Sequence, residues 1–109
     1  MKYKEDIIII LDSILDDYYL LWECFHDYVQ YGKSEEKFST FSEALKAAYA
    51  HQFLIFFKGE KFNGDEIPIP EFTLTDATIK ELLDHDNEPQ LEIRVATSEL
   101  GIAFLEKNR

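Results

Sequence analysis

Four carboxylates recur at helical spacing in the first part of the chain. They are separated by four, seven and four residues and are Asp12, Asp16, Glu23 and Asp27. On a continuous helix they would lie within about 60° of one another, at roughly 6, 10 and 6 Å along the axis. Carboxylates at that spacing can imitate phosphates or receive a lysine-rich surface. Tyr19 on the flank would add an amphipathic anchor of the kind that interfaces favour.

The helix that would position these carboxylates spans residues 5–31. Its apolar residues recur at spacings of three and four, and Gly32 follows where helices commonly end. The repeating apolar positions are Ile7, Ile10, Leu11, Ile14, Leu15, Tyr18, Leu21, Trp22, Phe25, Tyr28 and Val29. Two alternatives stand against a binding role for the acids. In the first, a break at Asp16 or Asp17 begins a second helix, so the four acids no longer share one face. In the second, the row is the solvated outer face of an amphipathic helix.

A second helix is predicted to begin at residue 40. Thr40 and Glu43, three residues later, form a capping-box pattern. Five residues at helical spacing would lie along its buried side, and they are Phe41, Leu45, Ala48, Tyr49 and Gln52. One lysine, Lys46, stands among the polar positions of this helix.

Two strand patterns follow, over residues 53–57 and residues 91–97. The second alternates apolar and polar side chains, which is typical of a half-buried strand. Between them, Pro68 and Pro70 keep the chain extended or at a sheet edge. We expect the two strands to pair antiparallel, with the helices packed on one face.

Two more helices are expected near the end of the chain. Thr75 or Asp76 caps a short helix that ends near residue 85, and Ser98 caps the last helix. Ile102 and Leu105 would turn inward from that last helix. The expected domain is therefore of the α+β class, mostly helical with a small antiparallel sheet.

The end of the chain, ATSELGIAFLE, is similar to the end of winged-helix regulators. In those proteins the second wing strand runs into a helix with a glycine in its first turn. The segment FSEALKAAYAHQFLIFFKGE, helix into strand, fits the same layout. Together with ILDDYYLLWECF, these features also resemble a group of small bacterial proteins of the same general plan. The resemblance implies a winged-helix-like fold and no particular activity.

Charge counts against a nucleic-acid partner. The chain has 22 Asp and Glu against 11 Lys and Arg, a formal net charge of −11 at pH 7. Such a field repels phosphate backbones and accelerates encounter with basic proteins. A helix that reads DNA would offer Lys46 alone, and the two arginines, Arg94 and Arg109, leave little for guanine readout.

Catalytic and metal-binding patterns are absent from the sequence. It contains no Gly-rich phosphate loop, nucleophile elbow or HExxH motif. Cys24 and His26 point roughly 200° apart on a helix, and Asp16 and Asp17 about 100° apart. We therefore expect no enzyme, no cofactor and no metal. A single domain over residues 1–109 is expected, in a soluble cytoplasmic protein that does not enter a membrane.

The sequence thus predicts a non-enzymatic binding protein that engages a basic partner. Its concrete form would be an inhibitor or immunity-type protein that neutralises a toxin or nuclease. The predicted contact residues are Asp12, Asp16, Tyr19, Glu23 and Asp27, with Asp65 and Glu66 as second choice. Two alternatives are a winged-helix transcription regulator and a homodimeric accessory protein that uses the Phe-rich region around the first strand.

Overall fold

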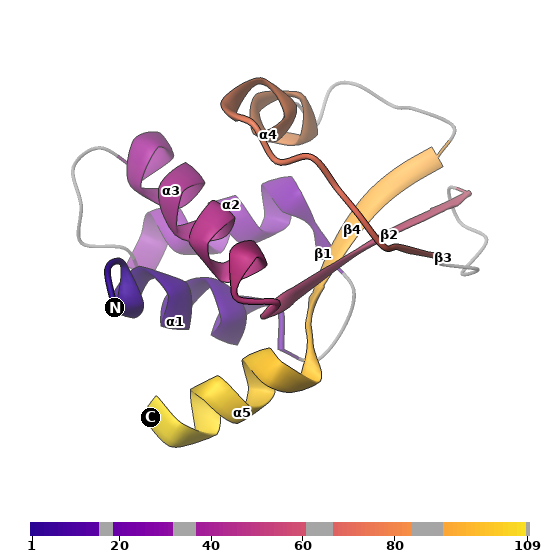
Figure 1. The fold of residues 1–109 in the computed structure, drawn as a ribbon. Coiled ribbons are helices and arrows are strands. Elements are labelled where there is room, and N and C mark those ends of the chain that lie inside the picture. The colour runs from indigo at the N-terminus through magenta and orange to yellow at the C-terminus, as the bar shows by residue number, and fades with distance from the viewer. Residues whose placement is uncertain (16–18, 32–36, 61–66, 84–90, 109) are drawn as a thin grey trace.

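The computed structural model describes residues 1–15, 19–31, 37–60, 67–83 and 91–108. These residues form helices and short strands in the order shown in Figure 1. The helices are α1 (Lys4–Ser13), α2 (Leu21–Tyr31), α3 (Lys37–Ala50), α4 (Asp76–Leu83) and α5 (Glu99–Asn108). The strands are β1 (Tyr19–Leu20), β2 (Leu54–Glu60), β3 (Ile67–Ile69) and β4 (Leu91–Thr97). The predicted α+β class is confirmed.

The strands form one antiparallel sheet in the order β1-β4-β2-β3. β2 and β4 pair along their whole length, from Leu54 opposite Thr97 to Glu60 opposite Leu91. The predicted antiparallel pairing of the two main strands is therefore confirmed. Pro68 lies in the edge strand β3, where a residue without a backbone N–H is best tolerated.

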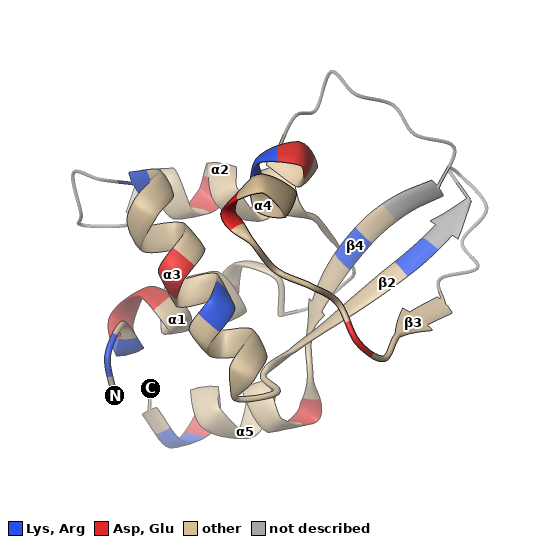
Figure 2. Ribbon diagram, turned by 45° about the horizontal axis from the view of Figure 1, so that its top comes forward, with Lys and Arg blue, Asp and Glu red and all other residues tan. Residues whose placement is uncertain are grey.

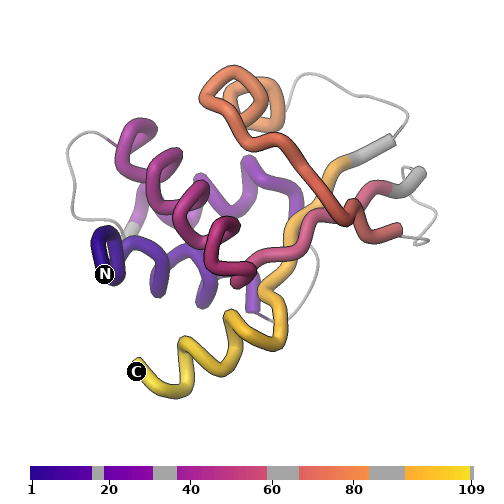
Figure 3. The backbone as a smooth tube through the Cα atoms, in the orientation of Figure 1, coloured from indigo at the N-terminus to yellow at the C-terminus, as the bar shows by residue number. Residues whose placement is uncertain are grey.

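The core lies between one face of the sheet and α1, α2 and α3, which gather on one side of it (Figure 3). Phe56 and Val95 are paired across β2 and β4, so both point to the inner face, and both are buried. Each of these helices contributes a buried stripe of side chains. The stripes are Ile7, Ile10 and Leu11 on α1, Leu21, Cys24 and Tyr28 on α2, and Phe41, Leu45 and Ala48 on α3.

The chain does not form one helix over residues 5–31. The alternative is correct in its break, but α2 begins at Leu21, after β1, and not directly after Asp16 or Asp17. α1 ends at Ser13, and Tyr19 and Leu20 pair with Val95 and Arg94 before α2 begins. The Glu23 carboxylate accepts the backbone N–H of Leu20 at 3.0 Å, which caps α2 from its third position. The positions of the apolar side chains around α2 therefore do not continue those of α1.

Other boundaries also differ from the prediction. α3 begins at Lys37, so Thr40 lies inside the helix and is not its cap. Gln52 is exposed and has a φ of 64°, because the backbone turns there from α3 into β2. Ile102 is exposed whereas Leu105 is buried, so the inward face of α5 passes through Leu105 and not Ile102. Thr75 is the cap of α4, since its hydroxyl accepts the Thr78 N–H at 3.1 Å.

The segment from Thr97 to Gly101 ties the end of the chain to two distant turns. The Thr97 hydroxyl donates to the Leu11 carbonyl at 2.9 Å, at the end of α1. The Ser98 hydroxyl donates to the Gln52 carbonyl at 2.6 Å and accepts the Gly101 N–H at 3.1 Å. The cap at Ser98 is thus confirmed, and it also fixes the turn between α3 and β2.

Gly101 is required by the closeness of this junction. A Cβ atom placed there would lie 2.7 Å from Cγ2 of Thr97 and would overlap the Phe53 carbonyl. The Ser98 N–H donates to the same Phe53 carbonyl at 2.9 Å, so that group cannot easily move away. The glycine in the first turn of α5 therefore has a packing reason.

Candidate partner-binding surfaces

The predicted row of acids is divided between two helices. Asp12 is exposed on α1, whereas Glu23 and Asp27 are half-buried on α2. Asp16 lies outside the described residues. Because β1 separates the two helices, the single continuous face on which the row was based does not exist.

Tyr19 does not flank a helix. It lies in β1 opposite Val95, half-buried, and its ring packs against the core. Asp65 and Glu66, the second choice for a partner contact, lie outside the described residues. Of the predicted contacts that the structure describes, Glu23 and Asp27 lie together, one turn apart on α2, where side chains at positions i and i+4 are neighbours.

The exposed side of α2 also carries residues that the sequence interpretation assigned to the core. Trp22 and Val29 are 37% and 41% exposed, and His26 between them is exposed as well. The buried stripe of α2 is Leu21, Cys24 and Tyr28, which leaves these three on another side. We call Trp22, His26 and Val29 the α2 ridge. At 100° per residue these three lie about 80° to 140° around the helix from Leu21, so a buried stripe defined on α2 alone, and not on residues 5–31 together, would have left them outside it.

The helix that would read DNA is partly covered by the chain itself. The Ser42 hydroxyl, 1% exposed, donates to the Asp76 carboxylate, and Lys46 Nζ lies 2.8 Å from the same carboxylate. The backbone N–H of Phe72 donates to the Tyr49 hydroxyl at 2.8 Å. The stretch leading into α4 therefore lies along one side of α3.

Lys46 is held between two carboxylates. Its second partner is Glu43 Oε1 at 3.4 Å. The hydrogen bond to Asp76 is the main reason why the pKa of Lys46 is raised, and the bonds from Lys46 and then Ser42 lower the pKa of Asp76. The lysine in the middle of α3 thus has its charge balanced within the chain.

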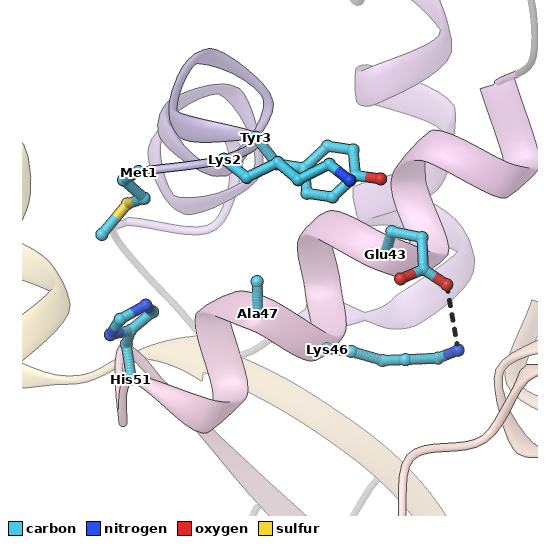
Figure 4. Close-up of a pocket in the computed structure, with 7 residues that line it drawn as sticks. All are labelled: Met1, Lys2, Tyr3, Glu43, Lys46, Ala47 and His51. Atoms are coloured by element: carbon cyan, nitrogen blue, oxygen red, sulfur yellow. Dashed lines mark hydrogen bonds and ion pairs between the residues drawn. The ribbon is translucent and has the colours of Figure 1, made fainter.

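A depression of about 420 Å³ lies between α3 and the residues before α1 (Figure 4). Its lining includes Lys2, Tyr3, Glu43, Lys46 and His51, and Lys2 Nζ lies over the Tyr3 ring at 5.3 Å. Glu43 and His51 are eight residues apart, about 12 Å along a helix axis, which is too far for a shared proton. Glu43 points to Lys46 instead, so this depression holds no acid–base pair.

Two further reactive groups of the described residues, the Cys24 thiol and the Tyr28 hydroxyl, belong to buried side chains. Cys24 is buried, and burial raises the pKa of its thiol to about 12, so almost no thiolate forms at neutral pH. Burial and the Asp6 carboxylate, which accepts the Tyr28 hydroxyl at 2.8 Å, raise the pKa of Tyr28. Among the described residues no three His, Cys, Asp or Glu come together as metal ligands. None of the described helices has the length and apolar character to cross a bilayer.

The Phe-rich region is covered by the chain. The Phe56 ring stacks on Phe72 at 4.7 Å and meets Tyr49 edge-on at 5.3 Å. Phe53 stacks on Phe104 at 4.6 Å. The segment between the main strands thus folds over Phe56. Phe62 lies outside the described residues.

The chain matches no known family model, no curated protein and no solved structure. Function is therefore inferred from the residues of this chain alone.

Proposed function

We propose that the chain is a non-enzymatic, cytoplasmic binding protein whose partner is a basic protein. The concrete form is an inhibitor or immunity-type protein that neutralises a toxin or nuclease by covering its cationic site. The observation that carries the proposal is the pairing of Lys46 with Asp76 and Glu43 in a chain of net charge −11. The helix best placed for a polyanion has its central cation neutralised, whereas the excess of carboxylates favours a cationic partner.

The distribution of basic residues supports the same conclusion. In the described part of the chain they are spread over helices and strands and interspersed with acids, and α3 carries two of them, Lys37 and Lys46 (Figure 2). Lys58 and Arg94 lie on neighbouring strands, but Arg94 is opposite Phe57, so the two side chains point to opposite faces of the sheet. Lys58 and Arg94 therefore do not form a continuous basic ridge for a phosphate backbone.

The predicted contact residues differ in how well they suit this role. Glu23 and Asp27 stand together on α2, and Asp12 is exposed on α1. Tyr19 is packed against the core, which makes it the weakest of the predicted contacts. Asp16, Asp65 and Glu66 stay predictions from sequence.

The test is binding of the whole chain to poly-lysine and to a mixture of genomic DNA fragments, each at about 50 and 500 mM salt. We expect poly-lysine to bind at low salt and to be released at high salt, because exposed charges are screened within a few ångströms there. We expect no gel shift of any DNA fragment. A DNA shift at low salt without poly-lysine binding would overturn the proposal. The basic product of an adjacent reading frame is the first natural partner to try.

A second candidate is a winged-helix transcription regulator. It is favoured by the passage from α3 into β2 and from β4 into the glycine-containing start of α5, which the sequence resemblance implies, although β3 and α4 stand between β2 and β4. The paired state of Lys46 and the cover over Ser42 count against it. The same gel shift separates the two candidates, since a regulator must shift some fragment.

A further inference from the structure

The α2 ridge lies on a helix whose opposite side is fixed in the core. Leu21, Cys24 and Tyr28 are each at most 2% exposed, so α2 cannot rotate to bury Trp22 or Val29. Trp22 and Val29 are seven residues apart, which places them about 20° apart around the helix and about 10 Å apart along it. His26 fills the position between them. The ridge is therefore a continuous two-turn strip held in one orientation.

Carboxylates border this strip. Glu23 and Asp27 each follow a ridge residue directly in sequence, so they lie about 100° further around the helix. Glu23 is fixed by the Leu20 N–H, and the His26 ring lies 3.3 Å from the Gln30 amide. The exposed side of α2 thus combines an aromatic and aliphatic strip with an acidic border.

This combination differs from the exposed apolar residues of the sheet. Single exposed apolar side chains such as Ile55 or Ile67 are ordinary on protein surfaces. Tryptophan at the centre of a contact, by contrast, commonly contributes a large share of its binding energy. A surface of this kind fits an apolar residue with lysines or arginines around it.

We propose that the α2 ridge, with Glu23 and Asp27, is the surface that docks an amphipathic basic helix of the protein partner. This inference rests on the proposed function and deepens it by naming the surface and the partner's chemistry. Apolar side chains of the partner pack against Trp22 and Val29, and its lysines or arginines meet the two carboxylates. A second copy of this chain is a poor occupant, because a two-fold contact would bring Glu23 and Asp27 against their own copies.

Trp22 is the chain's one tryptophan, so its fluorescence reports contact at this surface alone. The probe is a synthetic amphipathic helix of about 14 residues, with leucines along one face and lysines along the other. Poly-lysine and a glutamine-for-lysine version of the helix are the comparison ligands. We expect the leucine–lysine helix to shift Trp22 emission to the blue, poly-lysine to bind without a shift, and the neutral helix not to bind.

Single substitutions test which residues of α2 contact the leucine–lysine helix. Val29→Ala, measured by calorimetry, is expected to weaken binding of the leucine–lysine helix about tenfold, because it removes apolar surface that the complex would bury. Asp27→Asn is expected to weaken it less and to reduce its salt dependence. The matched controls are Ile102→Ala and Glu106→Gln on α5, both exposed, which should bind as the unaltered chain does.

The outcomes separate the two proposals. If poly-lysine and the leucine–lysine helix bind but Trp22 emission and the Val29→Ala affinity are unchanged, the surface lies elsewhere and only this inference falls. If neither cationic ligand binds, the proposed function falls with it. A dimer by light scattering that Val29→Ala dissociates would show that a second copy covers the ridge, and would also overturn the inference. Circular dichroism of each variant confirms that it is folded.

Discussion

The starts of α5 and α2 are both capped, but the cap of α5 is bonded to residues far away in sequence whereas the cap of α2 is local. At α5, Ser98 bonds to Gln52 and Phe53, which are far away in sequence, and Gly101 packs against backbone. At α2, the cap from Glu23 to Leu20 is local, and the next residue, Trp22, faces outward. The motif on which the winged-helix expectation was based is thus occupied in holding the fold together. The surface suited to a partner lies on a helix that carries no such motif.

The comparison predicts that substitutions at the α5 junction lower stability and that substitutions on the α2 ridge lower binding. The largest effect is expected for Gly101→Ala. Its Cβ would overlap the Phe53 carbonyl and Thr97, which forces the junction apart and lowers the free energy of unfolding by about 3 kcal/mol. Urea denaturation measures it, with Glu106→Ala on the exposed side of α5 as control. An unchanged midpoint would mean that the junction is less tightly packed than described.

The second largest loss of stability is expected for Ser98→Ala. It removes the cap of α5 and leaves the Gln52 carbonyl without its bond, at a cost of about 2 kcal/mol in unfolding free energy. Ser39→Ala, at an exposed position of α3, is the control and should change stability by less than about 0.5 kcal/mol. Equal effects of the two substitutions would remove the distinction between the junction and the surface.

The contact between α3 and α4 should depend on pH. The pKa of Asp76 is lowered in the folded chain by Lys46 and Ser42, so ionised Asp76 stabilises the fold above the ordinary pKa of about 3.9. This contribution is lost as pH falls through the lowered folded value. Asp76→Asn should therefore reduce the melting temperature at neutral pH and make little difference near pH 2. A difference that stays constant across this range would contradict the ion pair.

The smallest effect on stability is expected on the α2 ridge. Val29→Ala should change the unfolding free energy by less than about 0.5 kcal/mol, because Val29 is 41% exposed. Thermal unfolding checks it, with the buried Val95→Ala as the contrasting variant at about 2 kcal/mol or more. A large loss of stability at Val29 would mean that the ridge serves the fold, and the comparison would fail.

The sequence predicted the features that depend on local patterns. Alternation at residues 91–97, the proline at the β3 edge and the cap at Ser98 each follow from a few neighbouring residues, and all three are correct. The break before α2 was left as an alternative because apolar residues continue at helical spacing through β1. That spacing cannot show that Tyr19 and Leu20 pair with a strand more than seventy residues later.

The candidate surface was predicted only in part. Glu23 and Asp27 were found as acids one turn apart, but Trp22 and Val29 were assigned to the core with the phase of a single helix. On α2 the buried stripe passes through Leu21, Cys24 and Tyr28, and the angle of 100° per residue places Trp22 and Val29 outside it. The link from Lys46 to Asp76 joins residues thirty apart, and no local pattern indicates it.

The most direct measurement is the indole N–H resonance of Trp22 in a proton–nitrogen correlation spectrum during titration with the leucine–lysine helix. The account predicts that this resonance shifts and saturates together with backbone signals of α2, while signals of α3 around Lys46 stay in place. Saturable shifts centred on α3, with Trp22 unmoved, would contradict it.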